Sequence, residues 1–131
     1  MNKSDRILLA QFFVVLLLAV ATWLAVWQSL LWRIWWFDIP MHLLGGLWSG
    51  LCAAWLLARR GVDFSLGWCL AFALAVGLVW EIFEYSEGIA FPQYLSYPVD
   101  TVKDILMVVL GAVFGFLLAR KLGAVERRGM L

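Results

Sequence analysis

The side chains that could do chemistry in this sequence are ionisable groups inside long apolar stretches. They form three clusters with helical spacing: Asp38 with His42, Glu81 with Glu84, and Asp100 with Asp104. A spacing of three or four residues brings two side chains to the same face of a helix. Several close carboxylates in apolar surroundings cannot all remain ionised and unpaired. They must be protonated, paired with a cation or bound to a metal ion.

Carboxylate oxygens combined with one imidazole are typical ligands of a divalent cation. Such an oxygen-rich set favours Mg²⁺, Mn²⁺ or Ca²⁺ over Fe or Zn. We therefore predict a metal site whose ligands come from six residues: Asp38, His42, Glu81, Glu84, Asp100 and Asp104. The sequence contains no motif of a nucleophilic triad around its single histidine, so it assigns no catalytic residue and leaves open whether the protein is an enzyme.

Helix capping is the competing interpretation for the aspartates. Asp38 precedes Pro40 and could cap the following helix, and Pro40 is expected to prevent a regular i,i+4 pair between Asp38 and His42. The Thr101-x-x-Asp104 segment matches a capping box, so the acids of the last helix could serve its N-terminus alone. Metal binding and capping both remain open for these side chains.

The two glutamates have no such local role. Glu81 and Glu84 lie near the C-terminal end of the predicted third span, where the helix dipole disfavours negative charge. They are the strongest functional signal in the chain. Glu87, a few residues later, is interpreted as a solvated surface charge.

Four apolar segments must position these clusters. The chain has 131 residues, is 65% hydrophobic and only 15% charged, and has a mean hydropathy of +0.92. A soluble domain of this size cannot bury so much apolar surface. We predict one all-α membrane domain with four transmembrane helices, at about residues 7–31, 40–58, 64–85 and 98–119. A cleaved signal peptide is the alternative for the first segment, but its length and bulky tryptophans favour a retained helix.

The basic residues predict the orientation of these helices. Eight of the ten Lys and Arg residues lie in regions that four spans place on one side: Lys3, Arg6, Arg59, Arg60, Arg120, Lys121, Arg127 and Arg128. The positive-inside rule makes this side cytoplasmic. We therefore expect both termini in the cytoplasm of a bacterium and the polar site on the non-cytoplasmic side of the inner membrane. The net charge of +1 gives no basic face for a nucleic-acid partner.

Glycines continue the polar clusters along two of the predicted helices. Gly46 and Gly50 follow His42 at i+4 and i+8, and Gly111 and Gly115 continue the stripe of the acids in the last helix. The GxxxG spacing lets helix backbones approach closely in lipid. We expect these stripes to pack the helices together, and a homo-oligomer could also form through them. Ordinary glycine enrichment of membrane helices is the alternative.

These clusters and glycines resemble the VanZ-like and YjdF-type small bacterial integral membrane proteins. That pattern has a helix with Asp, His and small residues, a helix with an acidic motif, and a helix reading Asp-x-x-x-Asn-x-x-Gly-x-x-x-Gly. The corresponding segments are Asp38-Ile-Pro-Met-His42 with Gly45-Gly46, Trp80-Glu81-Ile-Phe-Glu84, and Asp100-Thr-Val-Lys-Asp104 with Gly111 and Gly115. The resemblance covers about residues 38–118. It departs at Val108, where the pattern has Asn, and at Pro40-Met41, where a Lys often precedes the His. It implies the fold and the polar positions and leaves the reaction open.

Three classes of function fit this pattern. The first is a membrane protein whose metal site acts on a phosphate-bearing lipid or cell-envelope substrate, with membrane lipid as its partner. The second is a structural or assembly subunit whose carboxylates make hydrogen bonds between helices. The third is a proton or cation transporter. It is weakened because no ionisable residue in the cytoplasmic halves of the last three spans continues a path, although an oligomeric pore would avoid this difficulty.

Overall fold

A computed structural model of the chain describes residues 3–62, 65–88 and 96–123. All elements within these ranges are helices: α1 (Lys3–Trp27), α2 (Leu30–Arg33), α3 (Asp38–Arg60), α4 (Leu66–Glu87) and α5 (Tyr97–Leu122). Four of them, α1, α3, α4 and α5, are long and apolar enough to cross a membrane. The predicted all-α fold with four candidate membrane spans is therefore confirmed.

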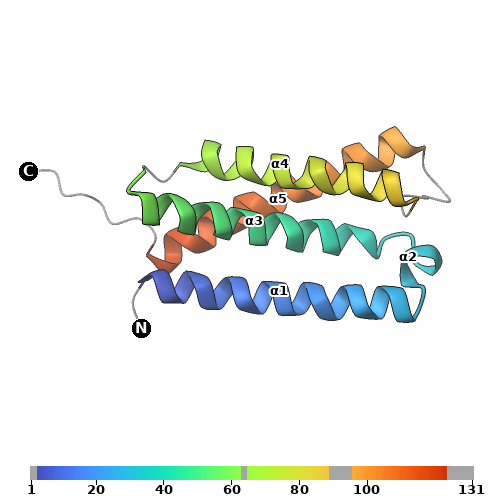
Figure 1. Ribbon diagram of the computed structural model, residues 1–131, viewed down its shortest axis with the longest axis horizontal. Coiled ribbons are helices and arrows are strands. Elements are labelled where there is room, and N and C mark those ends of the chain that lie inside the picture. Colours follow the sequence, from blue (N-terminus) through green and yellow to red (C-terminus); the bar gives the residue numbers. More distant parts are fainter. Residues whose placement is uncertain (1–2, 63–64, 89–95, 124–131) are drawn as a thin grey trace, which may run out of the picture.

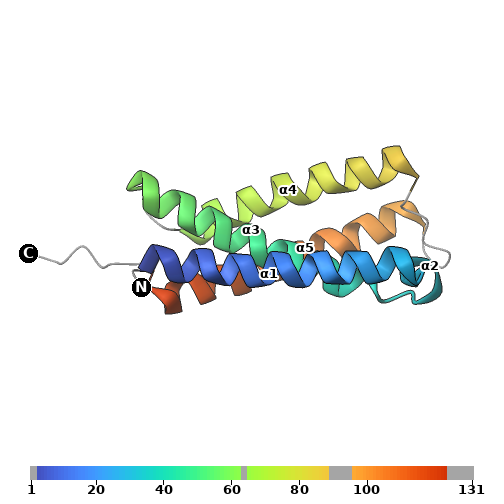
Figure 2. The same cartoon turned by 60° about the horizontal axis from the view of Figure 1, so that its bottom comes forward.

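The four long helices form a bundle in which α3 is central (Figure 1). Helix α3 packs against α5, α4 and α1, whereas α1 packs mainly on α3. Helix α1 begins and α5 ends at the end of the bundle where α3 leads into α4 (Figures 1 and 2). At the opposite end, α3 begins, α4 ends and α5 begins. This arrangement brings three helix ends together from segments that are far apart in the sequence.

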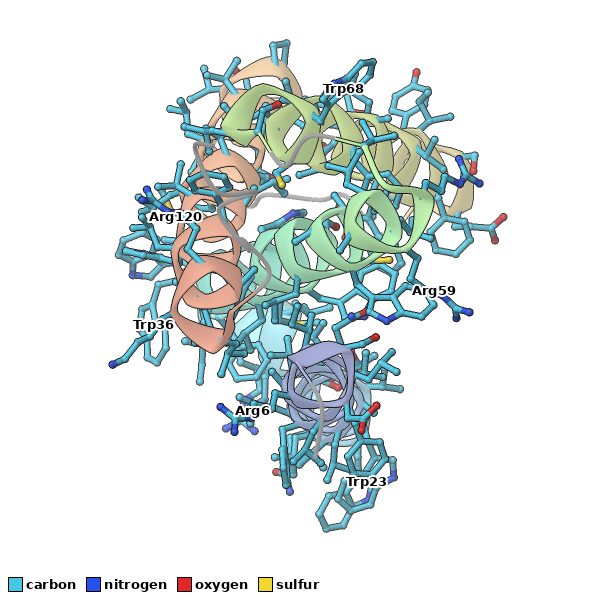
Figure 3. The ribbon with its side chains drawn as sticks, turned by 90° about the vertical axis from the view of Figure 1, so that its left-hand side faces the viewer. Arg6, Trp23, Trp36, Arg59, Trp68 and Arg120 are labelled. Atoms are coloured by element: carbon cyan, nitrogen blue, oxygen red, sulfur yellow. The ribbon has the colours of Figure 1, made fainter. Side chains whose placement is uncertain are left out.

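Opposite charges gather at the two ends of the bundle. Figure 3 looks along the bundle from the end where α1 begins, and Arg6, Arg59 and Arg120 lie around its rim on three different helices. The Arg59 guanidinium is 5.0 Å from the centroid of the Trp55 ring, a distance that suits a cation–π contact. We name the end of the bundle that carries Arg6, Arg59 and Arg120 the cation end. The carboxylates of the three predicted clusters lie at the other end, which we name the carboxylate end.

Helices α3 and α5 touch along a seam of glycines. A Cβ atom on any of four positions would lie too close to a backbone carbonyl of the opposite helix: Gly46, Gly50, Gly111 and Gly115. A Cβ on Gly46 would collide with the carbonyl oxygen of Val108, and one on Gly50 would lie 2.6 Å from that of Ala112. A Cβ on the adjacent Gly45, in contrast, would meet no atom within 4 Å. Both predicted GxxxG stripes therefore pack within one chain, and a homo-oligomer through them stays a prediction.

Some helix boundaries differ from the predicted ones. Helix α1 ends at Trp27 instead of near residue 31, because Ser29 adopts a left-handed backbone conformation (φ 53°) and the chain continues as the short α2. Helix α4 extends to Glu87, where Gly88 ends it with a positive φ. Helix α5 is longer than the predicted 98–119 at both ends. Residue 64, the predicted start of the third span, lies outside the described residues.

Candidate functional site

A polar cluster forms where the start of α3, the end of α4 and the start of α5 meet (Figures 1 and 2). It contains all six side chains predicted from the sequence: Asp38, His42, Glu81, Glu84, Asp100 and Asp104. It also contains three side chains that the prediction did not include: Tyr97, Thr101 and Lys103. The three helix ends thus contribute to one cluster, as expected from their shared location.

The imidazole of His42 lies at the centre of this cluster and is only 5% exposed. Its Nε2 atom is 3.1 Å from Asp38 Oδ1, 3.9 Å from Asp104 Oδ2 and 4.0 Å from Glu84 Oε2. Its Nδ1 atom is 4.0 Å from Glu81 Oε1. One buried ring therefore faces carboxylates from α3, α4 and α5.

The contact between Asp38 and His42 corrects the expectation for Pro40. Helix α3 already includes Asp38, its N-cap is Phe37, and the two side chains form a regular i,i+4 contact. Pro40 lies in the first turn, where backbone N–H groups have no partner within the helix. Its ring therefore removes no hydrogen bond, and the helix does not need to begin after it. The capping interpretation of Asp38 is wrong.

Lys103 holds the aspartates together. Its Nζ atom is 2.6 Å from Asp100 Oδ1, 3.2 Å from Asp104 Oδ1 and 3.5 Å from Asp38 Oδ2. One ammonium group thus pairs with carboxylates of both α3 and α5. We name these four residues the aspartate half of the cluster. The i,i+3 spacing of Asp100 and Lys103 is the signal that could have placed this lysine in the site.

The glutamates have no such cation. Within the described part of the chain, neither Glu81 nor Glu84 has a Lys or Arg side chain within 4.0 Å. The side chain of Glu81 is 6% exposed, and no described residue forms a hydrogen bond with its buried Oε1 atom. We name these two residues, together with His42, the glutamate half. Glu87 is exposed at the end of α4, as its interpretation as a surface charge requires.

The Thr101 side chain contacts Glu81 and does not form the predicted capping box. Helix α5 begins at Tyr97, so Thr101 lies in its second turn, where its hydroxyl donates a hydrogen bond of 2.9 Å to Glu81 Oε2. The Tyr97 hydroxyl also donates to the main-chain carbonyl of Glu81, at 3.3 Å. The predicted capping box is therefore wrong. Its threonine instead joins the start of α5 to the end of α4.

Two sets of side chains in the cluster are spaced as ligands of a metal ion. Each set offers one ligand atom per residue, all within 4.8 Å of one another: Asp38 with His42 and Asp104, and His42 with Glu81 and Glu84. Bonds of about 2.0–2.6 Å place two ligands of the same ion about 3–5 Å apart. Asp100, which we also predicted as a ligand, lies in neither set, and its carboxylate pairs with Lys103.

Comparisons with known proteins agree with a membrane protein. The family described as "Predicted membrane protein (DUF2238)" matches residues 3–123. A "UPF0314 protein" of Paracoccus denitrificans (strain Pd 1222) is 39% identical over 88 residues, which cover 63% of this chain and 44% of the relative. The chain thus spans less than half the length of this relative. No solved structure matches the chain.

The family match extends over all the described helices, from the start of α1 to the end of α5. Together with the bacterial relative it supports the coarse prediction of a small bacterial membrane protein. The more specific resemblance to VanZ-like proteins stays a prediction. The chain belongs to the DUF2238 family of predicted membrane proteins.

Proposed function

We propose that this membrane protein binds a divalent metal ion in the polar cluster. The observation that carries the proposal is the Oε1 atom of Glu81, which is buried and accepts no hydrogen bond from any described residue. An orphaned buried polar atom costs about 1–3 kcal/mol, and more when it is charged. The His42 Nδ1 atom lies 4.0 Å away, which is too far for a hydrogen bond and suits two ligands of one ion.

The charge of the cluster favours the same conclusion. Five carboxylates face one lysine and one histidine: Asp38, Glu81, Glu84, Asp100 and Asp104 against Lys103 and His42. A divalent cation would offset two further negative charges at the end of three apolar helices. Carboxylate oxygens with a single imidazole favour Mg²⁺, Mn²⁺ or Ca²⁺ over Fe or Zn.

The proposal includes the placement of the site in the membrane. The cation end, with Arg6, Arg59 and Arg120, would face the cytoplasm of a bacterium, because basic residues are retained on that side. The carboxylate end would then face the non-cytoplasmic side of the inner membrane. The resemblance of residues 38–118 to the VanZ-like and YjdF-type proteins is part of this proposal, since it involves the same acidic and histidine positions.

At that depth the metal would lie near the phosphate groups of lipids. We propose that its substrate or ligand is a phosphate-bearing lipid or cell-envelope molecule. The ion would neutralise the phosphate and lower the pKa of a bound water, and a carboxylate of the cluster would accept the proton. The supporting observation is the location of the cluster at the ends of three candidate spans.

Elemental analysis of the purified protein tests metal binding. After exposure to Mg²⁺, Mn²⁺ and Ca²⁺ and removal of free ions, the wild type should retain a divalent ion. Glu81→Gln should lose that ion, whereas Glu87→Gln, which removes an exposed carboxylate of the same helix, should keep it. A wild type without a bound divalent ion, or equal metal contents in all three proteins, would overturn the proposal.

Fluorescence quenching tests the phosphate ligand separately. Brominated phosphatidic acid and a brominated diacylglycerol, which lacks the phosphate, are compared as quenchers of the tryptophans, with and without Mg²⁺. Mg²⁺ should increase quenching by the phosphatidic acid in the wild type but not in Glu81→Gln. Equal effects of Mg²⁺ on the two lipids would contradict a phosphate-bearing lipid as the ligand and would leave metal binding intact.

A structural subunit is the second candidate, and a specific observation favours it. Lys103 joins α3 to α5, and the hydrogen bond from Thr101 to Glu81 joins α5 to α4. Such bonds between helices hold membrane bundles together without any catalysis. If no divalent ion binds in the experiments above, the polar cluster is better explained as a set of ion pairs and hydrogen bonds that hold the helices together.

A further inference from the structure

The two candidate ligand sets share His42 but differ in what already neutralises them. In the aspartate half, the Lys103 ammonium lies within 3.5 Å of carboxylate oxygens from Asp38, Asp100 and Asp104. In the glutamate half, no Lys or Arg side chain of the described residues lies within 4.0 Å of the Glu81 or Glu84 carboxylate. A positive charge is therefore present on one side of the imidazole and missing on the other.

The two nitrogens of His42 also face different halves. Nε2 is 3.1 Å from Asp38 Oδ1, which is within hydrogen-bond distance, and we therefore assign the donated proton to this nitrogen. In the neutral ring Nδ1 then keeps its lone pair, and it is the nitrogen nearest to Glu81 Oε1. Histidines that bind metals commonly donate their other N–H to a carboxylate in this way, which orients the ring.

We propose that Lys103 is a built-in cation that occupies the aspartate half and thereby confines the divalent ion to the glutamate half. The ion would be bound by Nδ1 of His42 together with Glu81 and Glu84. This inference rests on the proposed function, since it assigns the position and the number of the bound ions. Asp38 acts as a positioning residue for the imidazole, and Lys103 determines that each chain holds one ion.

The physical reason is competition for the same carboxylates. A second divalent ion between Asp38 and Asp104 would lie next to the Lys103 ammonium, and the two cations would repel each other in apolar surroundings. The lysine is tethered to α5 and needs no binding from solution. Removal of the lysine would leave the carboxylates of Asp38, Asp100 and Asp104 without a neighbouring cation. These three carboxylates could then bind a second divalent ion.

Counting the Mn²⁺ ions bound per chain tests this inference. The wild type should bind one ion. Lys103→Met, which keeps the length of the side chain and removes its charge, should bind two. Lys103→Arg should restore the count to one. Lys121→Met serves as the matched control, because it removes an exposed lysine of the same helix at the cation end, and it should also bind one.

The outcomes separate this inference from the proposed function. A wild type that binds no Mn²⁺ overturns the proposed function itself. A count of one in both the wild type and Lys103→Met overturns only the role of Lys103. A count of two in the wild type also overturns that role, since both halves would then be filled with the lysine in place.

A second measurement keeps the inference testable if Lys103→Met does not fold. Glu84→Gln removes a carboxylate from the ligand set of the glutamate half, and Asp104→Asn removes one from the ligand set of the aspartate half. Glu84→Gln should lose detectable Mn²⁺ binding, because it removes a ligand of the ion. Asp104→Asn, whose carboxylate pairs with Lys103, should weaken Mn²⁺ binding less. A loss in Asp104→Asn as large as that in Glu84→Gln, or larger, would show that the ion is not confined to the glutamate half.

Discussion

Helices α3 and α5 lie against each other in two regions of opposite character. In the glycine seam, the backbones touch, and not even a methyl group fits between Gly46 and the carbonyl of Val108. In the polar cluster, one helical turn nearer to the N-termini of both helices, the contact consists of the long or charged side chains of His42, Lys103 and Asp104. The glycine seam leaves no space between the two backbones. The polar cluster, in contrast, contains buried carboxylate oxygens that accept no hydrogen bond from the described residues.

The difference shows how an apolar bundle can position a polar site. His42 precedes Gly46 by four residues, and Asp104 precedes Val108 by four residues. Because Gly46 and Val108 touch, they fix the distance between the two helices directly beside the cluster. The seam can thus hold the carboxylates close to the imidazole despite their mutual repulsion. Stability should depend on the seam, and ligand binding on the cluster.

Adding one methyl group to the seam should have the largest effect. In Gly46→Ala, the new Cβ collides with the Val108 carbonyl, so α3 and α5 must move apart. We expect a loss of about 3 kcal/mol in the free energy of unfolding in detergent. Gly45→Ala is the matched control, since its Cβ would meet open space. Similar losses in both variants would show that the close contact of the helices does not carry stability.

Removal of one ligand should abolish the stabilisation by metal. At a free divalent ion concentration of 100 times the dissociation constant, the wild type should gain about 2.7 kcal/mol of stability. Glu81→Gln should show no such gain in a thermal melt. Without metal it should be at least as stable as the wild type, because it no longer buries a carboxylate with an unpaired oxygen. A metal response that survives in Glu81→Gln would contradict its role as a ligand.

Loss of the bond between α4 and α5 should have a smaller effect. Thr101→Val keeps the shape of the side chain but removes the donor to Glu81 Oε2. Side-chain hydrogen bonds between membrane helices contribute about 0.6 kcal/mol on average, and up to about 1.7 kcal/mol. We expect a loss of about 1 kcal/mol in the free energy of unfolding. Thr22→Val, an exposed position on α1, should have no effect.

The smallest effect is expected at the contact between α1 and α3. The Trp55 Nε1–H group donates a hydrogen bond of 3.0 Å to Ser4 Oγ on α1. Trp55→Phe should cost about 0.6 kcal/mol in the same unfolding measurement. Ser4→Ala should give a comparable loss, and the double variant should add little to either single one. Fully additive losses would show that this hydrogen bond does not join the two helices.

The spans and the members of the cluster could be predicted from the sequence because their signals are local. Continuous apolar segments identify four helices. The spacing of Glu81 and Glu84, and that of Gly46 and Gly50, identifies a shared helical face. Because successive spans reverse direction, the position of a residue along its span also predicts the end of the bundle at which it lies. These rules require no knowledge of side-chain contacts.

The partners inside the cluster could not be predicted in this way, because they depend on side-chain geometry. Lys103 directly precedes Asp104 in the sequence, but only the packing of α3 on α5 brings it to Asp38. Thr101 matches a capping motif, and only the exact start of α5 at Tyr97 removes it from the cap. The expectation that Pro40 separates Asp38 from the helix fails for a similar reason. A proline interrupts a helix only beyond the first turn, and the sequence does not show in which turn Pro40 lies.

The central position of α3 has a consequence for the biogenesis of the protein. Its mean hydropathy of 1.4 is lower than those of α1, α4 and α5, which are 2.5, 2.0 and 2.2. Its glycine face matches α5, which is synthesised only after α4. When α3 is synthesised, Asp38 and His42 therefore do not yet have their partners Lys103 and Asp104 on α5 or the two glutamates on α4. We therefore expect that packing against α5, and not the insertion of α3 alone, fixes the position of α3 in the membrane.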